Sequence, residues 1–294
     1  MSISLASAFG RRSVTLLALV ASSLTVFACA SEGGGEGGSD EDGETTTGKR
    51  VTLDTVMARS GELTFTNEEG WSIELSRALV SVGPFYYFEG EPIESAQDAL
   101  LAPPRPARPR DIWDGALGLL IGVAHAHPGH YVAGEARGEM LTASSVDLVA
   151  GPTTIAQGQG VTGLVRSGRF GWSSPAQGTF SADLGTHVVL VEGHATKDAE
   201  ERWFRLEATR DEALDAAGEL RVDGCVFDKV ELAGDGTVTV SINPSVWLAG
   251  SDFTDALVGA EGAPEVVPVG TQPFNAFERG LKKGGGYHFT FTAK

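Results

Sequence analysis

The chain has 294 residues, of which 41% are hydrophobic and 21% charged, the composition of an ordinary folded protein. Its 39 acidic and 22 basic residues give a formal net charge of −17. A surface this acidic repels nucleic acid and anionic lipid headgroups, which excludes a nucleic-acid partner.

The first 28 residues are typical of an export signal. Arg11 and Arg12 precede an uncharged apolar run that is shorter than the roughly 20 residues of a transmembrane helix and is interrupted by Ser and Thr. The run ends in Val26-Phe27-Ala28-Cys29, which resembles the lipobox of bacterial lipoproteins, where a peptidase cleaves before a lipid-modified cysteine. We expect residues 1–28 to be removed and Cys29 to carry lipid. The alternative is an ordinary secretory signal that leaves Cys29 as a free thiol.

A polar segment follows the cysteine. Residues 29–50 are rich in Gly, Ser, Thr, Asp and Glu, and such a segment predicts a flexible acidic tether between a lipid anchor and a folded domain. Ala30 stands where an Asp resembles an inner-membrane retention signal, so the outer membrane is the predicted location. With Cys29 lipidated, Cys225 has no partner, and we expect it to be a small buried residue of a strand rather than a metal-binding thiolate.

From residue 51 to the end, the sequence predicts a single domain that is mostly β. Alternation of apolar and polar residues marks strands with one buried face, and the 39 glycines suit many tight turns. The segments with this pattern are 62–66, 71–82, 85–88, 146–149, 161–170, 187–192, 202–207, 222–227, 236–242 and 287–292. Short strands separated by turns favour an antiparallel β-sandwich, or a barrel-like arrangement.

Helix is scarce in this pattern. The best candidate is residues 273–282, with Pro273 near its start, Lys282 at its end and Gly284 to stop it. Single helical turns are expected at 245–249 and at 252–257. The fold class is therefore all-β with one short C-terminal helix.

Residues 91–130 interrupt the strand pattern as a long insertion. The first part, to residue 114, holds five prolines and three arginines, and prolines remove the hydrogen-bond donors that a central strand needs. The second part is apolar over 116–124. Long loops in compact domains are either functional or disordered. Two interpretations remain: a lid over a site, or a passive excursion whose apolar half packs on the sheet.

A histidine cluster closes the insertion at His125, His127 and His130. Neutral imidazole is a common ligand of Zn and Cu. In an extended segment His125 and His127 project to the same side, and the Pro128-Gly129 turn folds His130 back toward them. The pattern predicts a Zn or Cu site with these three ligands. A solvated loop, or a histidine that only hydrogen-bonds the turn, is the structural alternative.

Further ligands or supporting groups are expected near this cluster. Glu135 and Glu139 follow on the next segment, where carboxylates complete a metal shell or orient ring N–H groups. Counting by twos puts His187 and His194 on opposite faces of one strand. Of the distal histidines, His194 is the favoured fourth ligand because it lies near a strand end, where loops meet.

Four further stretches of the sequence are distinctive: Phe65-Thr66-Asn67 to Gly70, Ile73 to Ala78, Val240 to Pro244 with Trp247, Asp252 and Phe253, and Phe277 to Leu281 continuing to Phe291. They resemble uncharacterised bacterial β-sandwich lipoproteins that carry histidine-rich loops. There is also a faint similarity to surface copper-binding proteins of copper-scavenging systems. The resemblance implies a β-sandwich protein that is located at the cell envelope and binds transition metals. It assigns no tryptophan to copper chemistry.

Three functions follow from these patterns. The first is a lipid-anchored envelope protein that captures or buffers Zn or Cu without turnover, held at the membrane by Cys29. The second is a structural or interaction lipoprotein that binds another envelope protein and no metal. The third is a metal-dependent hydrolase, which needs an open coordination site and a general base such as Glu135 or Glu139. Because no catalytic spacing accompanies the histidines, we favour binding over catalysis.

Overall fold

Strands make up about half of the residues that the computed structural model describes, which are 48–93 and 131–294. The barrel strands are β1 (Arg50–Arg59), β4 (Phe85–Phe88), β5 (Ala136–Met140), β7 (Thr153–Val161), β8 (Gly163–Gly171), β11 (Arg221–Leu232), β12 (Gly236–Ile242) and β14 (Tyr287–Ala293). The second-sheet strands are β2 (Thr64–Thr66), β3 (Ser72–Val82), β6 (Ser144–Asp147), β9 (His187–Lys197), β10 (Glu200–Thr209) and β13 (Glu265–Val266). The prediction of a mostly β fold is confirmed.

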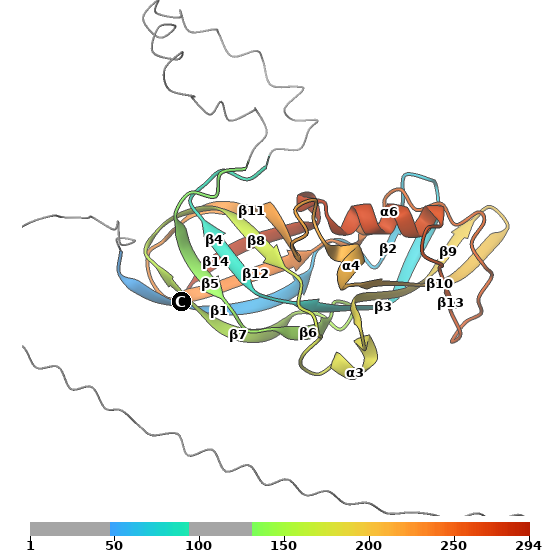
Figure 1. Ribbon diagram of the computed structural model, residues 1–294, viewed down its shortest axis with the longest axis horizontal. Helices are drawn as coiled ribbons and strands as arrows, with labels where there is room; N and C mark the ends of the chain where they lie inside the picture. The colour runs from blue at the N-terminus through green and yellow to red at the C-terminus, as the bar shows by residue number, and fades with distance from the viewer. Residues whose placement is uncertain (1–47, 94–130) are drawn as a thin grey trace, which may run out of the picture. The chain divides into compact units, whose positions relative to one another are not determined.

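Eight strands close into a barrel in the order β1-β12-β14-β11-β8-β4-β5-β7 (Figure 1). The barrel-like arrangement is thus the one found, beside a second sheet. The expected antiparallel pairing is wrong at two places in the barrel, since β1 pairs with β12 and β14 with β11 in parallel. The second case has a simple cause. β14 lies between β11 and β12, which run in opposite directions, so it must be parallel to one of them and is antiparallel to β12.

The second sheet has the order β13-β10-β9-β3-β2, with β6 paired to the far half of β3. Its edge pair, β10 and β13, is also parallel. The chain passes from this sheet into the barrel at Gly83, between β3 and β4. Gly83 has a φ of 104°, and a β-carbon there would lie 2.5 Å from the carbonyl oxygen of Thr142, so only glycine fits the crossing.

Aromatic rings pack inside the barrel. Phe289 of β14 lies against Tyr87 and Phe227, with ring centroids 6.0 and 5.9 Å apart, and all three side chains are buried. Glycines make room for them: a β-carbon at Gly168 would lie 2.8 Å from the Phe289 ring, and one at Gly138 2.8 Å from the Tyr87 ring. Ring and glycine together fill the interior at the density that protein cores require.

Helices lie on both faces of the second sheet (Figure 1). They are α3 (Ser181–Leu184), α4 (Arg210–Ala213), α5 (Pro244–Leu248) and α6 (Gln272–Leu281), whereas the 3-10 turn η1 (Gly284–Gly286) lies against barrel strand β11 and α5. The predicted C-terminal helix is confirmed as α6, and the turn at 245–249 as α5, whereas the short helices α3 and α4 were not predicted. The helical turn expected at 252–257 is wrong: Asp252 there bonds Thr254 through its side chain and the segment forms a non-helical turn.

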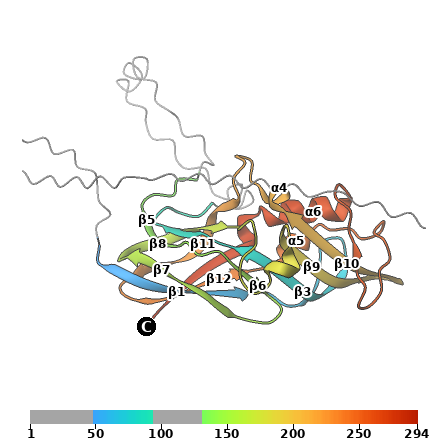
Figure 2. The same cartoon turned by 60° about the horizontal axis from the view of Figure 1, so that its bottom comes forward.

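Helix α6 buries Phe274 and Phe277 in the main core, and the Phe277 ring lies 6.4 Å from Trp247 of α5. Figure 2 shows α5 and α6 side by side along the sheet. On the opposite face, α3 contributes Leu184 to a small separate cluster with Leu79 and Leu190. The face of the sheet beside α3 is therefore only partly covered, and its remainder carries polar side chains.

The described residues all belong to one unit, Glu44–Lys294. Residues predicted to end the tether already bond the barrel: the backbone N–H of Lys49 donates to Thr162 Oγ1 at 3.0 Å, and Arg50 begins β1. Within the described ranges, none of the helices is both apolar enough and long enough to cross a bilayer. The predicted signal, Cys29, most of the tether and nearly all of the insertion lie outside the described residues.

Candidate functional site

The two ends of the insertion are fastened to the barrel at what we call the insertion base, residues 89–93 and 131–135. The β4–β5 pairing continues there, with the N–H of Glu89 donating to Glu135 O at 3.1 Å and that of Gly90 to Ala133 O at 2.8 Å. Tyr131 donates to Ser167 Oγ at 2.8 Å, and Ser167 in turn donates to Gly90 O at 2.6 Å. Burial raises the pKa of the Tyr131 phenol, which therefore stays neutral as a donor.

Carboxylates surround the insertion base, and most are engaged by arginines. Arg137 binds both Glu89, through Nε at 2.7 Å, and Glu135 at 2.9 Å. Arg166 pairs with Glu91, and Arg169 with Asp223. These carboxylates already have cationic partners, so a metal ion would have to displace a guanidinium to use them.

The predicted ligands fall in three places. His125, His127 and His130 lie outside the described residues. Glu135 and Glu139 lie on or beside barrel strand β5, with Glu135 paired to Arg137, whereas His194 lies on β9 of the second sheet. Among the residues that the structure describes, no group of three or more His, Cys, Asp or Glu side chains is arranged to hold a metal.

Cys225 is buried inside β11, as the strand pattern predicts, and its Sγ lies 3.3 Å from Val222 O. Burial raises the pKa of its thiol to about 12, so the group is protonated at neutral pH. A protonated buried thiol is neither a nucleophile nor a ready metal ligand.

A separate polar region lies on the outer face of the second sheet, defined here as the face that carries Ser76, Glu192, His194, Trp203 and Arg205. Strand pairing sets these side chains in rows, with Trp203 opposite His194 and Arg205 opposite Glu192. The intervening residues Gly193, Phe204 and Leu206 point into the core. A register shift after Leu75 leaves Ser76 as an extra residue facing outward.

Part of this face is hollowed. A hollow of about 540 Å³ is lined by Ser76, Glu192, Trp203 and Arg205 and, on its far side, by residues 261–264. The indole of Trp203 stacks on the imidazole of His194, with centroids 4.2 Å apart and an angle of 12° between the planes. Arg205 lies 3.7 Å from Glu192 and also pairs with Glu207.

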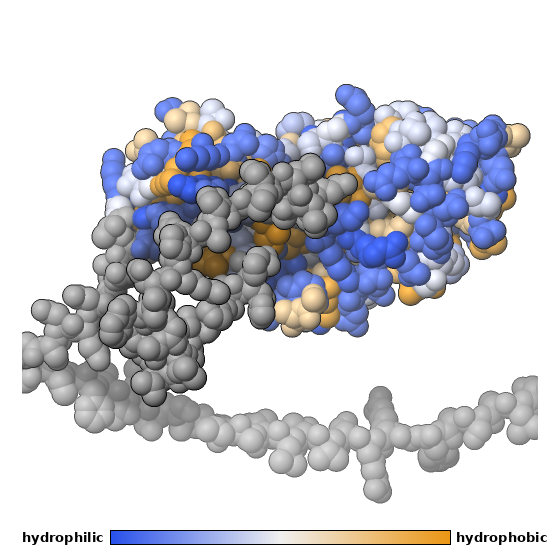
Figure 3. Space-filling view, turned by 90° about the horizontal axis from the view of Figure 1, so that it is seen from above, coloured by the Kyte–Doolittle hydropathy of each residue, from blue (hydrophilic) through white to orange (hydrophobic). Residues whose placement is uncertain are grey.

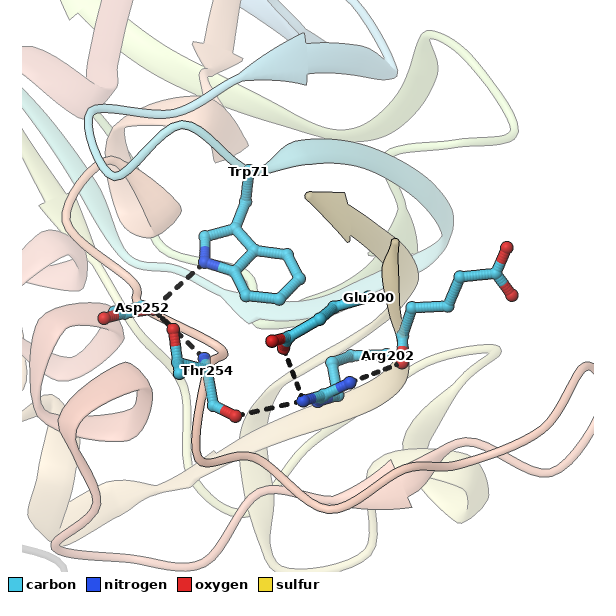
Figure 4. Close-up of polar contacts among 6 residues, drawn as sticks. Trp71, Glu200, Arg202, Asp252 and Thr254 are labelled. Carbon is cyan, nitrogen blue, oxygen red and sulfur yellow. Dashed lines mark hydrogen bonds and ion pairs between the residues drawn. The ribbon is translucent and has the colours of Figure 1, made fainter. Parts of the chain in front are cut away.

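The far side of the hollow belongs to a segment that we call the wall, residues 251–264. It is fastened to β10 by Arg202, whose Nη2 donates to Thr254 O at 3.0 Å and to Glu200 at 2.7 Å (Figure 4). Asp252 fixes its start by accepting from Trp71 Nε1 at 3.0 Å. Beyond the wall, β13 pairs with Phe204 and Arg205, so both ends of the segment are attached to the same strand.

The prediction that His187 and His194 face opposite sides of one strand is wrong, because an extra residue at Val188 resets the alternation and puts His187 beside Glu207, on the face of β10 that carries Trp203. The strand is not regular: a shift between Ala208 and Thr209 of β10 falls opposite the start of β9, and His187 Nε2 lies 3.6 Å from Glu207. His187 Nδ1 bonds Leu184 O at 3.1 Å. His187 and His194 thus have different partners, Glu207 and Trp203. His288 is 42% exposed and bonds Asp228 at 2.7 Å.

No protein-family model, curated protein or solved structure matches this chain. Its function must therefore be inferred from its own residues.

The hollow was not predicted from the sequence. The alternation of residues 202–207 indicates a strand and puts Trp203 and Arg205 on one face, which is a usable signal. What the pattern lacks is any sign that residues 261–264, some 60 positions later, return to face them. That closure depends on long-range bonds such as Arg202 to Thr254.

Proposed function

We propose that the chain is a lipid-anchored protein of the bacterial cell envelope that binds Zn or Cu through His125, His127 and His130. One observation carries the proposal: the cluster ends one residue before Tyr131, whose hydroxyl is bonded to Ser167 of the barrel at 2.8 Å. A segment joined to a fixed point loses less conformational freedom when its ligands converge on an ion.

The charges at the insertion base favour imidazole as the donor set. Glu89 and Glu135 are engaged by Arg137, and Asp223 by Arg169, whereas a neutral imidazole carries no charge with which a guanidinium could pair. Imidazole ligands suit Zn and Cu(II). Glu135, the carboxylate nearest in sequence to the histidines, is held by a guanidinium and is poorly suited to act as a general base. We therefore propose capture or buffering of the metal without turnover.

The anchor belongs to the same proposal. Lipid on Cys29 and the acidic residues up to 50 would hold the barrel near a membrane surface, and the outer membrane is the proposed location. The strong net acidity, −19 once a signal with two arginines and no acid is removed, raises the local concentration of divalent cations near the protein.

The test is a metal titration of residues 29–294 with Cys29→Ser, followed by calorimetry with Zn²⁺ and with Cu²⁺ separately. We expect one tight site for at least one metal, and loss of at least a hundredfold in affinity when His125, His127 and His130 are all changed to Ala. The matched control is His187→Ala with His288→Ala, which removes imidazoles that have partners elsewhere in the fold.

Two results would overturn the proposal. One is the absence of any site for Zn²⁺ or Cu²⁺ in the unmutated chain. The other is a site that survives in the triple variant but disappears in the control, which would move the metal to the described part of the fold.

A further inference from the structure

The hollow on the second sheet has the size and chemistry of a small-molecule site. Its volume of about 540 Å³ lies within the roughly 300–1,000 Å³ of ligand pockets. The lining combines one aromatic ring with both hydrogen-bond donors and acceptors. It lies in the second sheet, whereas the insertion leaves the chain between barrel strands β4 and β5.

Trp203 gives the hollow a flat apolar surface. The stacking on His194 at 4.2 Å holds the indole in one orientation, and β10 is paired on both sides at this point, with β9 and β13. A ring fixed before binding costs no rotamer entropy when a ligand packs on it. The electron-rich face of an indole attracts the weakly positive C–H groups on one side of a sugar ring.

The hollow is lined by two carboxylates, Glu192 and Glu261, and by one guanidinium, that of Arg205. Arg205 lies between Glu192, at 3.7 Å, and Glu207, so its positive charge is compensated and an anion gains little. The Glu192 carboxylate is in turn shared with that guanidinium, which weakens its attraction for a free cation. Together with the hydroxyl of Ser76, these groups both donate and accept hydrogen bonds, which is what a neutral ligand rich in hydroxyls requires.

The wall makes the hollow largely preformed. Arg202 ties it to β10 through Thr254, and β13 ties its other end through Phe204 and Arg205. Between these points the backbone turns sharply, with two hydrogen bonds between Ala260 and Ala263 of 3.1 and 2.9 Å and Gly262 at a φ of 74°. A preformed site leaves little ordering cost to be met on binding.

We propose that this hollow binds a neutral saccharide, with one sugar ring against Trp203 and its hydroxyls bonded to Glu192, Arg205 and Ser76. The proposal is independent of the metal proposal and concerns another part of the fold. It makes the protein a binder of glycan at the envelope, whether the sugar belongs to a polymer or is free.

The experiment is a titration of residues 29–294 bearing Cys29→Ser with three neutral disaccharides, cellobiose, maltose and chitobiose. Binding is followed by calorimetry and by NMR shifts of the tryptophan indole N–H groups. We expect at least one disaccharide to bind with a Kd of about 1 mM or tighter. Trp203→Ala should weaken that binding at least tenfold, about 1.4 kcal/mol.

Controls separate a binding role from a structural one. Glu192→Gln keeps the shape of the side chain and should weaken the same disaccharide several-fold while leaving thermal unfolding little changed. Tyr86→Ala removes a half-buried ring from the barrel and should leave binding unchanged, as should the triple histidine variant of the metal test. Tetramethylammonium chloride and sodium sulfate serve as charged probes.

The proposal is overturned if none of the three disaccharides binds at concentrations about ten times that Kd. It is equally overturned if binding survives both Trp203→Ala and Glu192→Gln. Binding of tetramethylammonium or sulfate that Trp203→Ala abolishes, with no disaccharide binding, would assign the hollow to a charged ligand instead.

Discussion

The barrel interior and the outer face of the second sheet are both built from alternating side chains, but the interior is filled and the outer face borders a hollow. In the barrel, rings such as Tyr87, Phe227 and Phe289 meet one another and rest on glycines, so the interior is occupied. On the second sheet, Trp203 and Arg205 face a hollow that the wall borders without filling. A closed barrel here serves as a support, and ligand chemistry is to be sought outside it.

Exposed hydrophobic residues are also found both on the barrel and beside the second sheet. Of the eight exposed large hydrophobic residues in the described part of the chain, seven lie at two places. Ile93, Val132 and Val226 lie near the insertion base, and Leu257, Val258, Val266 and Val269 lie in and after the wall, whereas Leu141 directly follows β5. Figure 3 shows hydrophobic surface among hydrophilic atoms on the barrel end of the face seen from above. Both places adjoin the two regions where we propose binding, which agrees with the tendency of contiguous exposed apolar surface to mark interaction sites.

The largest expected effect tests whether the barrel is the core. Phe289→Ala should lower the free energy of unfolding by about 3–5 kcal/mol, because it empties the space shared by several buried rings. Trp203→Ala removes a larger but half-buried ring and should cost roughly 1 kcal/mol. Urea unfolding of both variants measures the difference. Equal losses would mean that the outer face is as much a part of the core as the barrel.

An intermediate effect concerns the wall. Arg202→Ala removes the bonds to Thr254 O and Glu200 from a side chain that is only 12% exposed, and should cost about 1–2 kcal/mol. Amides of residues 252–262 should then exchange faster with solvent than amides of the barrel. The matched control is Arg210→Ala, since Arg210 is 54% exposed and lies 3.6 Å from Asp211; it should stay within about 0.5 kcal/mol.

Exchange that rises equally in the wall and the barrel would contradict the assignment of Arg202 to the wall. It would show that the second sheet and the barrel open together and that the hollow has no independent support.

The sequence predicts the second sheet better than the barrel, and the reason lies in particular residues. Strand β10 and the first half of β3 alternate hydrophobic and polar side chains, and β9 contains the continuous β-branched and apolar run Val188 to Val191, so the positions of these strands follow from the sequence. Strands β1, β5 and β7 were missed as strands. Their interior positions include Thr55, Gly138 and Gly160, which do not register as hydrophobic although they face the core.

Small residues inside a barrel are required by the rings opposite them. A β-carbon at Gly160 would lie 2.9 Å from Leu53 Cδ1, so the position is kept small by a neighbour more than 100 residues away. The parallel pairing of β14 with β11 has the same origin, since it depends on which strands flank β14 in space. Local periodicity carries no information on either point.

The two candidate sites also differ in whether neighbouring or distant residues of the sequence form them. The histidine cluster is conspicuous in sequence because its members lie within six positions. The hollow joins residues from β3, β9, β10 and the wall, and only the register of β9 against β10 brings Glu192 beside Arg205 and His194 beside Trp203. A site assembled across strands becomes visible only when pairing is known.

The smallest expected effect is a pH dependence at the start of the wall. Hydrogen bonds from Thr254 hold the pKa of the Asp252 carboxyl below its ordinary value of 3.8, assisted by Trp71 and opposed by partial burial. A carboxyl whose pKa is lower in the folded state contributes stability that is complete above 3.8 and is lost as the pH falls through the lower folded value. Asp252→Asn should therefore flatten the decline of the urea midpoint between about pH 5 and pH 2.5.

The control Asp211→Asn removes an 83% exposed carboxylate outside the wall and corrects for the loss of one negative charge. If the slope for Asp252→Asn matches that of the unmutated chain, Thr254 and Trp71 do not favour the ionised form of Asp252 in the folded state, and the charge of this carboxylate does not contribute to holding the wall.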